Sequence, residues 1–323
     1  MTGKDVDIGF LEEKDSWLLH PRFFPSKVGG KPSWLDLNNI VLPSDLTCKH
    51  CNEVMIFLCQ IYAPFEEKDD SFHRTLFIFI CKNGPCCRPN NSDNLKVYRC
   101  QLPRKNDFYS FEPHEENKNE VFPMDKKHQV LHWQKGHKQN CDNSLEEDHY
   151  FTVTESGKSI LFKEWELIVD EEDKEDVKNV DTNQEMEKLR KLMHEQKAGT
   201  LNDINESELE EYAGNMPEDK VYNKFTKRIA KHPDQVLRYD RGGTPLWITG
   251  SNNTIIDVPN CQYCNGERKF EFQIMPQLLN YINVGIDLNS IDWGVLAVYT
   301  CKDSCNSGPA YKEEILIKQD LNT

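Results

Sequence analysis

The sequence predicts an α+β fold, mostly β, in which two duplicated β-rich modules with Cys-x-x-Cys pairs are joined by an acidic linker. Two observations lead to this prediction: a set of positions recurs at one constant displacement, and apolar runs of strand type follow each copy. Such a recurrence indicates that one structural unit occurs twice. The recurring residues are Gly29, Gly30, Pro32, Trp34, Cys48 and Cys51, found again 213 positions later as Gly242, Gly243, Pro245, Trp247, Cys261 and Cys264.

Short segments rich in Val, Ile, Phe and Tyr, bounded by Pro, Asn and Asp, predict the strands of each module. A proline opens the apolar segment 276–282 where its missing N–H does no harm to a helix, and apolar residues four apart in 217–232 indicate another helix. A third helix candidate is 184–196. The expected strands are 54–62, 74–81 and 95–101 in the first module, 269–274 and 294–300 in the second, and 159–169, which completes one of the two sheets.

Composition divides the chain into five segments. Residues 1–113 form the first module and residues 215–323 the second. Between them lie a segment containing Cys and His at 114–145, the strand segment 146–169, and a linker at 170–214 that is rich in Asp, Glu, Lys and Asn. Dense charge with few apolar residues predicts that this linker is solvated.

Charge limits the classes of partner. The 39 basic and 54 acidic side chains of the 323 residues leave a formal net charge of -15. Binding to phosphates needs a positive surface, so we expect no direct nucleic-acid partner, and a basic protein is the better electrostatic match. The start of the chain lacks a leader, and the apolar run 76–81 is too short to cross a bilayer. We therefore expect a soluble protein of the reducing cytoplasm, and the sequence leaves nuclear entry open.

Each module carries a candidate metal site. Four thiolates complete the tetrahedral shell of a structural zinc ion, and paired cysteines in a long chain without a leader favour metal over disulfides. Buried free thiols and a redox-active dithiol remain alternatives. Cys87 adjoins Cys86, so the sequence leaves open which of them is a ligand. The candidate ligands are Cys48, Cys51, Cys81 and Cys86 in the first module and Cys261, Cys264, Cys301 and Cys305 in the second.

The sequence contains no nucleophile elbow, no phosphate-binding loop and no His-Glu-x-x-His motif. A site closed by four thiolates also leaves no coordination position for a reactive water. We therefore expect that the protein is not an enzyme. Under the zinc hypothesis, replacing Cys48 or Cys261 by serine would release metal and destabilise one module.

The segment HQVLHWQKGHKQNC, which contains His128, His137 and Cys141, resembles the end of a MYND-type zinc finger. The first half of that finger is missing, because Met124 stands where its cysteine is expected and no cysteine pair lies between Cys100 and this segment. The segment 114–145 is thus interpreted as the remnant of a finger that cannot fill its metal sites.

Several longer segments resemble the programmed cell death protein 2 family. They are FPSKVGGKPSWL, QIYAPF, FHRTLFIFIC and RCQLPRKNDFYSFEP in the first half, and QVLRYDRGGTPLWI, FEFQIMPQLLNYI and SIDWGVLAVYTC in the second. The resemblance implies a dedicated chaperone that captures newly made S5-family ribosomal protein of the small subunit and supports its delivery to pre-ribosomes. We expect a monomer that holds one such client. The alternative is a scaffolding adaptor that regulates transcription or cell-cycle proteins through peptide binding.

Candidate client-binding residues come from the repeat and from the most distinctive family segment. Trp34 and Trp247 follow the paired glycines, and large rigid side chains often anchor interfaces. A structural role, in which each tryptophan packs on its own sheet, is the competing interpretation. Asp107, Phe108 and Tyr109 lie in RCQLPRKNDFYSFEP and are the other candidates.

Overall fold

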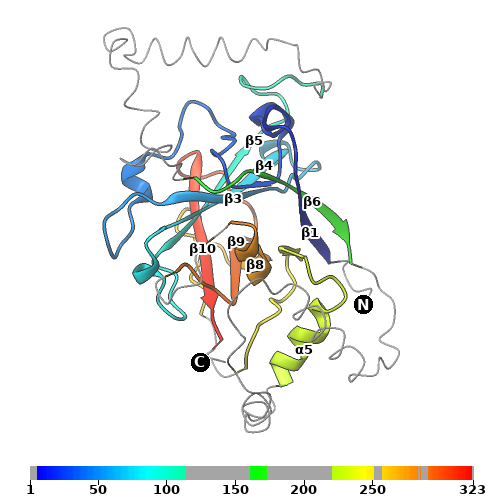
Figure 1. Ribbon diagram of the computed structural model, residues 1–323. Helices are drawn as coiled ribbons and strands as arrows, with labels where there is room; N and C mark the ends of the chain where they lie inside the picture. Colours follow the sequence, from blue (N-terminus) through cyan, green and yellow to red (C-terminus); the bar gives the residue numbers. More distant parts are fainter. Residues whose placement is uncertain are drawn as a thin grey trace, which may run out of the picture.

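The computed structural model describes residues 6–113, 161–172, 220–250, 257–282, 284 and 290–321. These residues are mostly β, as the sequence predicts, with ten strands and one α-helix (Figure 1). The strands are β1 (Asp7–Glu12), β2 (Lys27–Val28), β3 (Ile56–Tyr62), β4 (His73–Ile80), β5 (Leu95–Leu102), β6 (Trp165–Glu171), β7 (Leu237–Tyr239), β8 (Arg268–Ile274), β9 (Val295–Cys301) and β10 (Tyr311–Gln319).

Short 3-10 helices occupy the connections, and the α-helix α5 (Lys220–Ile229) lies within the predicted helix 217–232. Phe225 of α5 is buried against Ile248, Met275 and Val295. The predicted helix at 276–282 is a 3-10 helix, and the candidate at 184–196 lies outside the described residues. The 3-10 helices are η1 (Ser16–Leu19), η2 (Pro21–Phe23), η3 (Pro43–Leu46), η4 (Asp69–Ser71), η5 (Gly84–Cys86) and η8 (Pro276–Asn280).

All ten strands form a single closed sheet in the order β1-β6-β2-β3-β4-β5-β10-β9-β8-β7. The halves meet where β5 pairs antiparallel with β10 and where β1 pairs antiparallel with β7. The expectation of two separate sheets is therefore wrong. Each half alone would leave unpaired strand edges, and pairing the halves edge to edge covers most of them.

The first strand of each half crosses to the other half. β1 precedes β2 in the chain but pairs with β7, whereas β6 precedes β7 and pairs with β2. β1 also pairs over its whole length with residues 166–171 of β6. The strand predicted at 159–169 is thus β6, and it joins both halves. It continues to Glu171, two residues into the segment that composition assigns to the linker.

Local features match between the halves at the displacement seen in the sequence. A β-bulge follows Phe57 in β3, and another follows Phe270 in β8. The carboxamide of Gln60 accepts from the backbone N–H of Ser33 at 2.8 Å, and that of Gln273 accepts from the N–H of Leu246 at 2.6 Å. The two halves therefore hold the loop after the paired glycines in the same way.

Side-chain alternation along the strands separates two apolar cores. Leu76, Ile78 and Ile80 of β4 belong to the core that contains Leu296 and Val298 of β9. Phe77 and Phe79 of β4 point to the opposite face and pack with the long loop that precedes β3. That loop includes Leu46 and Cys48, so the outer core of the first half continues into its thiol cluster.

Buried ion pairs join the halves inside the barrel. Arg74 of β4 donates to both carboxylate oxygens of Glu271 in β8, at 2.5 and 2.7 Å, and both side chains are fully buried. Arg99 of β5 contacts Glu314 of β10 at 2.7 Å and is also fully buried. Burial alone would raise the pKa of Glu271, but the Arg74 guanidinium outweighs it and holds the pKa at about 2. Glu271 is therefore ionised and paired in the folded protein.

The described residues include no helix long and apolar enough for a transmembrane span.

Glu271→Gln should destabilise the barrel by about 3–5 kcal/mol, because it leaves the buried Arg74 without its counter-charge. Chemical denaturation at neutral pH measures this change. Glu267→Gln is the matched control, since its ion pair with Lys302 at 3.1 Å is exposed and exposed pairs contribute at most about 1 kcal/mol.

The pH dependence gives a second readout of the same substitution. The pKa of Glu271 lies below its ordinary 4.5, so its contribution to stability is complete above pH 4.5 and is lost as the pH falls through about 2. Glu271→Gln should therefore weaken the loss of stability over this interval. Equal effects of both substitutions at neutral pH would contradict a structural role for this pair.

Candidate metal centres

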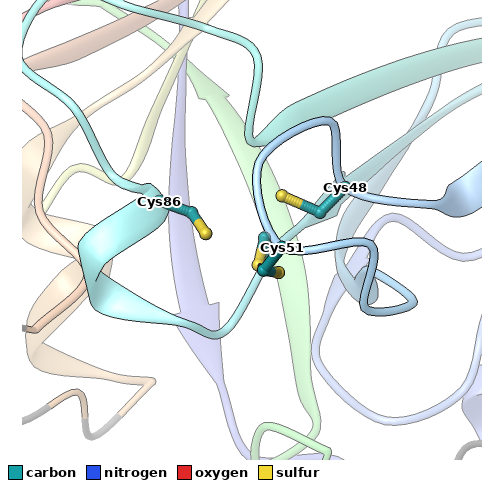
Figure 2. A group of neighbouring side chains, drawn as sticks. Cys48, Cys51 and Cys86 are labelled. Carbon is teal, nitrogen blue, oxygen red and sulfur yellow. The ribbon is translucent and has the colours of Figure 1, made fainter.

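The first cluster gathers four thiols from two connections, the one between η3 and β3 and the one between β4 and β5. Cys48 and Cys51 lie in the turn between η3 and β3, Cys81 directly follows β4, and Cys86 ends η5. All four sulfur atoms lie within 4.8 Å of one another, and the sulfurs of Cys51 and Cys81 are 3.5 Å apart. Figure 2 shows the side chains of Cys48, Cys51 and Cys86 converging. The structure thus brings together the residues that sequence spacing selected.

The second cluster repeats this arrangement in the other half. Cys261 and Cys264 lie in the turn before β8, Cys301 ends β9, and Cys305 lies in the loop that follows. The sulfurs of Cys261 and Cys305 are 3.7 Å apart, and those of Cys264 and Cys301 are 3.6 Å apart. The N–H of Gly266 donates to the sulfur of Cys264 at 3.4 Å. Backbone donation of this kind favours the thiolate form.

Both Cys-x-x-Cys turns have the same backbone geometry. The N–H of Asn52 donates to the carbonyl of Cys48, and the residue is left-handed with a φ of 61°. Asn265 donates to the carbonyl of Cys261 in the same way, with a φ of 58°. Asparagine tolerates this conformation better than most residues, which explains its place in both turns. The turn directs two sulfurs of each cluster to one side.

The sulfur spacing fits a tetrahedral metal ion. A zinc–sulfur bond of about 2.3 Å implies sulfurs about 3.8 Å apart in a regular tetrahedron, close to the spacings of 3.5 to 3.7 Å found here. The eleven cysteines in the described residues form no disulfide. Four thiol donors are the set that structural zinc prefers. The two clusters could therefore hold metal ions such as zinc, with all four positions filled by the protein.

The electrostatics of the clusters also favour a bound cation. Burial and the neighbouring sulfurs raise the pKa of Cys86 to about 11 and that of Cys305 to about 12. Four thiolates at this spacing repel one another, and a divalent cation at their centre removes that penalty. Neither Cys-x-x-Cys turn begins a helix, so the arrangement lacks the helix N-terminus that activates many redox dithiols.

Cys87 lies outside the first cluster, whereas the neighbouring Cys86 belongs to it. The sulfur of Cys87 instead donates to the carbonyl of Asp292 at 2.8 Å and lies 3.3 Å from the Lys318 ammonium. Cys59 and Cys100 are buried in strands, where burial raises the pKa of both thiols. Their positions agree with the structural role expected from the sequence.

The loop of the second cluster docks on the first half. Arg99 donates to the carbonyl of Cys305 at 3.2 Å, and the guanidinium of Arg74 donates to the hydroxyl of Ser304 at 3.0 Å. Gln101 donates to the carbonyl of Ser304 at 3.1 Å. Three polar side chains of β4 and β5 thus bind the backbone or a side chain of the loop that carries the second cluster.

The loop of the first cluster docks on the second half in return. The backbone N–H of Asn90 donates to the carboxylate of Asp320 at 2.7 Å, and the carboxamide of Asn90 accepts from the N–H of Asp320 at 2.9 Å. Lys318 donates to the carbonyl of Arg88 at 3.1 Å. Each cluster therefore fixes a loop that supports the opposite half. The sequence did not predict this docking. The only sequence signal for the docking is the presence of polar residues inside apolar strands.

The candidate client-binding residues differ in exposure. Trp34 is half-buried against Phe77 and Tyr311, and its carbonyl accepts from the hydroxyl of the buried Tyr109 at 2.9 Å. This packing matches the competing structural interpretation. Phe108 and Trp247 are half-buried, whereas Asp107 is exposed. His128, His137 and Cys141 of the finger remnant lie outside the described residues, as does most of the predicted linker.

A closed ten-stranded barrel with two four-thiol clusters defines a class of β-rich proteins that could carry two structural metal ions. The N-terminal domain of programmed cell death protein 2 matches residues 5–116, and the domain described as its C-terminal putative domain matches residues 219–320. The chain belongs to the programmed cell death protein 2 family. No solved structure matches the chain significantly.

Full-length relatives support this assignment. The chain is 38% identical to programmed cell death protein 2 of Bos taurus over 356 residues, covering 98% of this chain and 96% of the relative. It is 26% identical over 336 residues to the programmed cell death protein 2-like protein of Homo sapiens, covering 91% and 90%. A shorter match, 33% identical over 128 residues, covers 36% of this chain and 31% of the probable 20S rRNA accumulation protein 4 of Schizosaccharomyces pombe.

If zinc occupies both clusters, Cys86→Ser should halve the zinc content from two ions per chain to one, because it removes a ligand of the first cluster. The matched control is Cys87→Ser, which changes the neighbouring thiol outside the cluster and should leave two ions bound. Elemental analysis of protein purified under reducing conditions measures both. Loss of zinc from the Cys87 variant alone would contradict the ligand assignment.

Cys301→Ser should destabilise both halves together rather than one module, because its loop supplies the partners of Arg74 and Arg99. Amide hydrogen exchange should rise in β4 and β5 as well as in β8 and β9. The Cys87→Ser variant again serves as the control. An increase in hydrogen exchange confined to β8 and β9 would contradict this prediction and indicate two independent modules.

Proposed function

We propose that this protein is a dedicated chaperone that captures newly made S5-family ribosomal protein of the small subunit and supports its delivery to pre-ribosomes. The observation that carries the proposal is membership of the programmed cell death protein 2 family over nearly the whole chain. The name of the Schizosaccharomyces pombe relative, which refers to 20S rRNA accumulation, directs the proposal toward ribosome biogenesis. The proposed activity is binding, without catalysis.

The charge of the chain suits such a client. Ribosomal proteins carry many lysines and arginines for contact with rRNA, whereas this chain has a formal net charge of -15. Opposite net charges speed encounter and favour the basic partner over others. In this proposal the chaperone shields the client's charge in the cytoplasm, and the complex is a monomer of each.

The two thiol clusters serve this function as structural sites in the proposal. Zinc in each cluster would be held by Cys48, Cys51, Cys81 and Cys86 or by Cys261, Cys264, Cys301 and Cys305. Such an ion supplies folding free energy and leaves no position for a substrate. The matched turns, bulges and glutamines support the hypothesis that the halves arose by duplication of one module.

Co-expression with the S5-family ribosomal protein should give a complex of one chain each that survives purification at high salt. An unrelated ribosomal protein of similar basic charge is the control and should not co-purify. Size-exclusion chromatography with light scattering measures the stoichiometry. Equal recovery of both proteins would reduce the interaction to nonspecific charge attraction, and recovery of neither would favour the adaptor alternative.

A further inference from the structure

Part of one edge of β6 has no neighbouring strand among the described residues. The N–H of Leu167 donates to Ser26 at 2.9 Å, on the β2 side, and the N–H of Glu172 donates to Val6 at 2.8 Å, on the β1 side. Because antiparallel strands alternate, the backbone groups of Val169 point away from β1. They have no partner in the described part of the chain, since β2 pairs only with Trp165 and Glu166 of β6.

The geometry of the chain before β2 explains this gap. Pro25 would stand opposite the middle of β6 but has no N–H, and its carbonyl accepts from Gln60 at 2.9 Å. Phe24 is left-handed, with a φ of 50°, and stacks on His73 with ring centroids 4.1 Å apart. The chain therefore turns away from β6 at Pro25. In Figure 1 β6 lies at the side of the molecule, next to β1.

The side chains along this edge are apolar and then acidic. Ile168 is 37% exposed and Val169 is 48% exposed, although both lie within a strand of the barrel. Asp170 and Glu171 follow, and neither forms an ion pair in the described residues. Charged side chains and proline commonly protect an exposed edge strand from pairing. From Ile168 to Glu171 this edge carries no proline and only acidic charges, so it is protected against a like-charged strand and open to a basic one.

The charges on this edge select the kind of strand that it accepts. Asp170 and Glu171 place two adjacent carboxylates at this end of the edge. Acidic side chains attract a cationic neighbour and repel an acidic one. A second copy of this chain would instead bring the same acidic strand and a further charge of -15 to the edge. An extended basic segment is the favoured occupant.

We propose that the free edge of β6, from Ile168 to Glu171, binds an extended basic segment of the client by strand addition. The backbone of Val169 supplies a donor and an acceptor, the apolar side chains supply contact area, and Asp170 and Glu171 pair with lysines or arginines. This inference rests on the proposed function, because it names the surface that holds the basic ribosomal protein.

The test compares two substitutions at one position in the full chain. Val169→Pro removes the outward N–H, which belongs to no hydrogen bond of the barrel, so proline is tolerated there. Val169→Thr keeps the backbone donor and the side-chain shape and is the matched control. Val169→Pro should weaken binding of purified S5-family ribosomal protein by at least about tenfold, and Val169→Thr by less than about twofold. Thermal unfolding and zinc content verify that both variants fold.

A charge-reversed variant provides an independent readout if the proline variant is unstable. Asp170→Lys combined with Glu171→Lys should weaken binding and flatten its dependence on salt concentration. Binding by a folded Val169→Pro variant within twofold of wild type would overturn the inference and leave the chaperone proposal intact. Charge reversal that leaves binding and its salt dependence unchanged would likewise overturn the inference and leave the chaperone proposal intact. Absence of binding by the wild-type chain would overturn both the inference and the chaperone proposal. If the wild-type chain is a dimer and Val169→Pro dissociates it, the edge serves self-association and the inference is overturned.

Discussion

The contact between Arg74 and Glu271 is the constraint on which the rest of the structure depends. The two residues come from opposite halves, and each is fully buried. A charge removed from water without its partner costs several kcal/mol, about the whole margin of stability of a typical domain. Each half therefore supplies the counter-charge that the buried side chain of the other half needs in the closed barrel. Closure of the barrel follows as a condition of folding, and the hydrogen-bonded seams β5–β10 and β1–β7 are its consequence.

Each thiol cluster lies beside a loop that contacts the opposite half of the barrel. Ser304 completes the hydrogen bonds of Arg74, and the carbonyl of Cys305 accepts from Arg99, so the second cluster fixes the loop that both arginines need. The first cluster fixes Asn90, which pairs with Asp320 beyond the last strand. A cation that joins four thiolates would thus stabilise contacts between the halves as well as its own loop. Metal binding and barrel closure would then depend on each other.

Local sequence signals predicted the parts that depend on local geometry. Cysteines at short spacing lie in one turn, so the sequence predicted the residues of both clusters. It left open only the choice between Cys86 and Cys87. Six of the ten strands, namely β3, β4, β5, β6, β8 and β9, were predicted because their apolar character is local, whereas β1, β2, β7 and β10 were not predicted. The exchange of β1 and β6 was missed, since pairing between distant strands leaves no periodic signal. Arg74 and Glu271 stood in apolar runs and could have indicated a buried partner, but the sequence gives no way to identify which charge pairs with which.

Closing the barrel also determines where the protein can still form a sheet with another chain. Closure removes edges, so a free edge remains only where a strand extends past its neighbour. β2 has two residues and β6 has seven, so the edge of β6 that faces β2 has no neighbouring strand beyond Leu167 in the described residues, although its other edge pairs with β1. The same carboxylates that make this edge soluble repel a second copy of the chain and attract a basic one. Solubility and selectivity for a basic client thus follow from one local arrangement of charge.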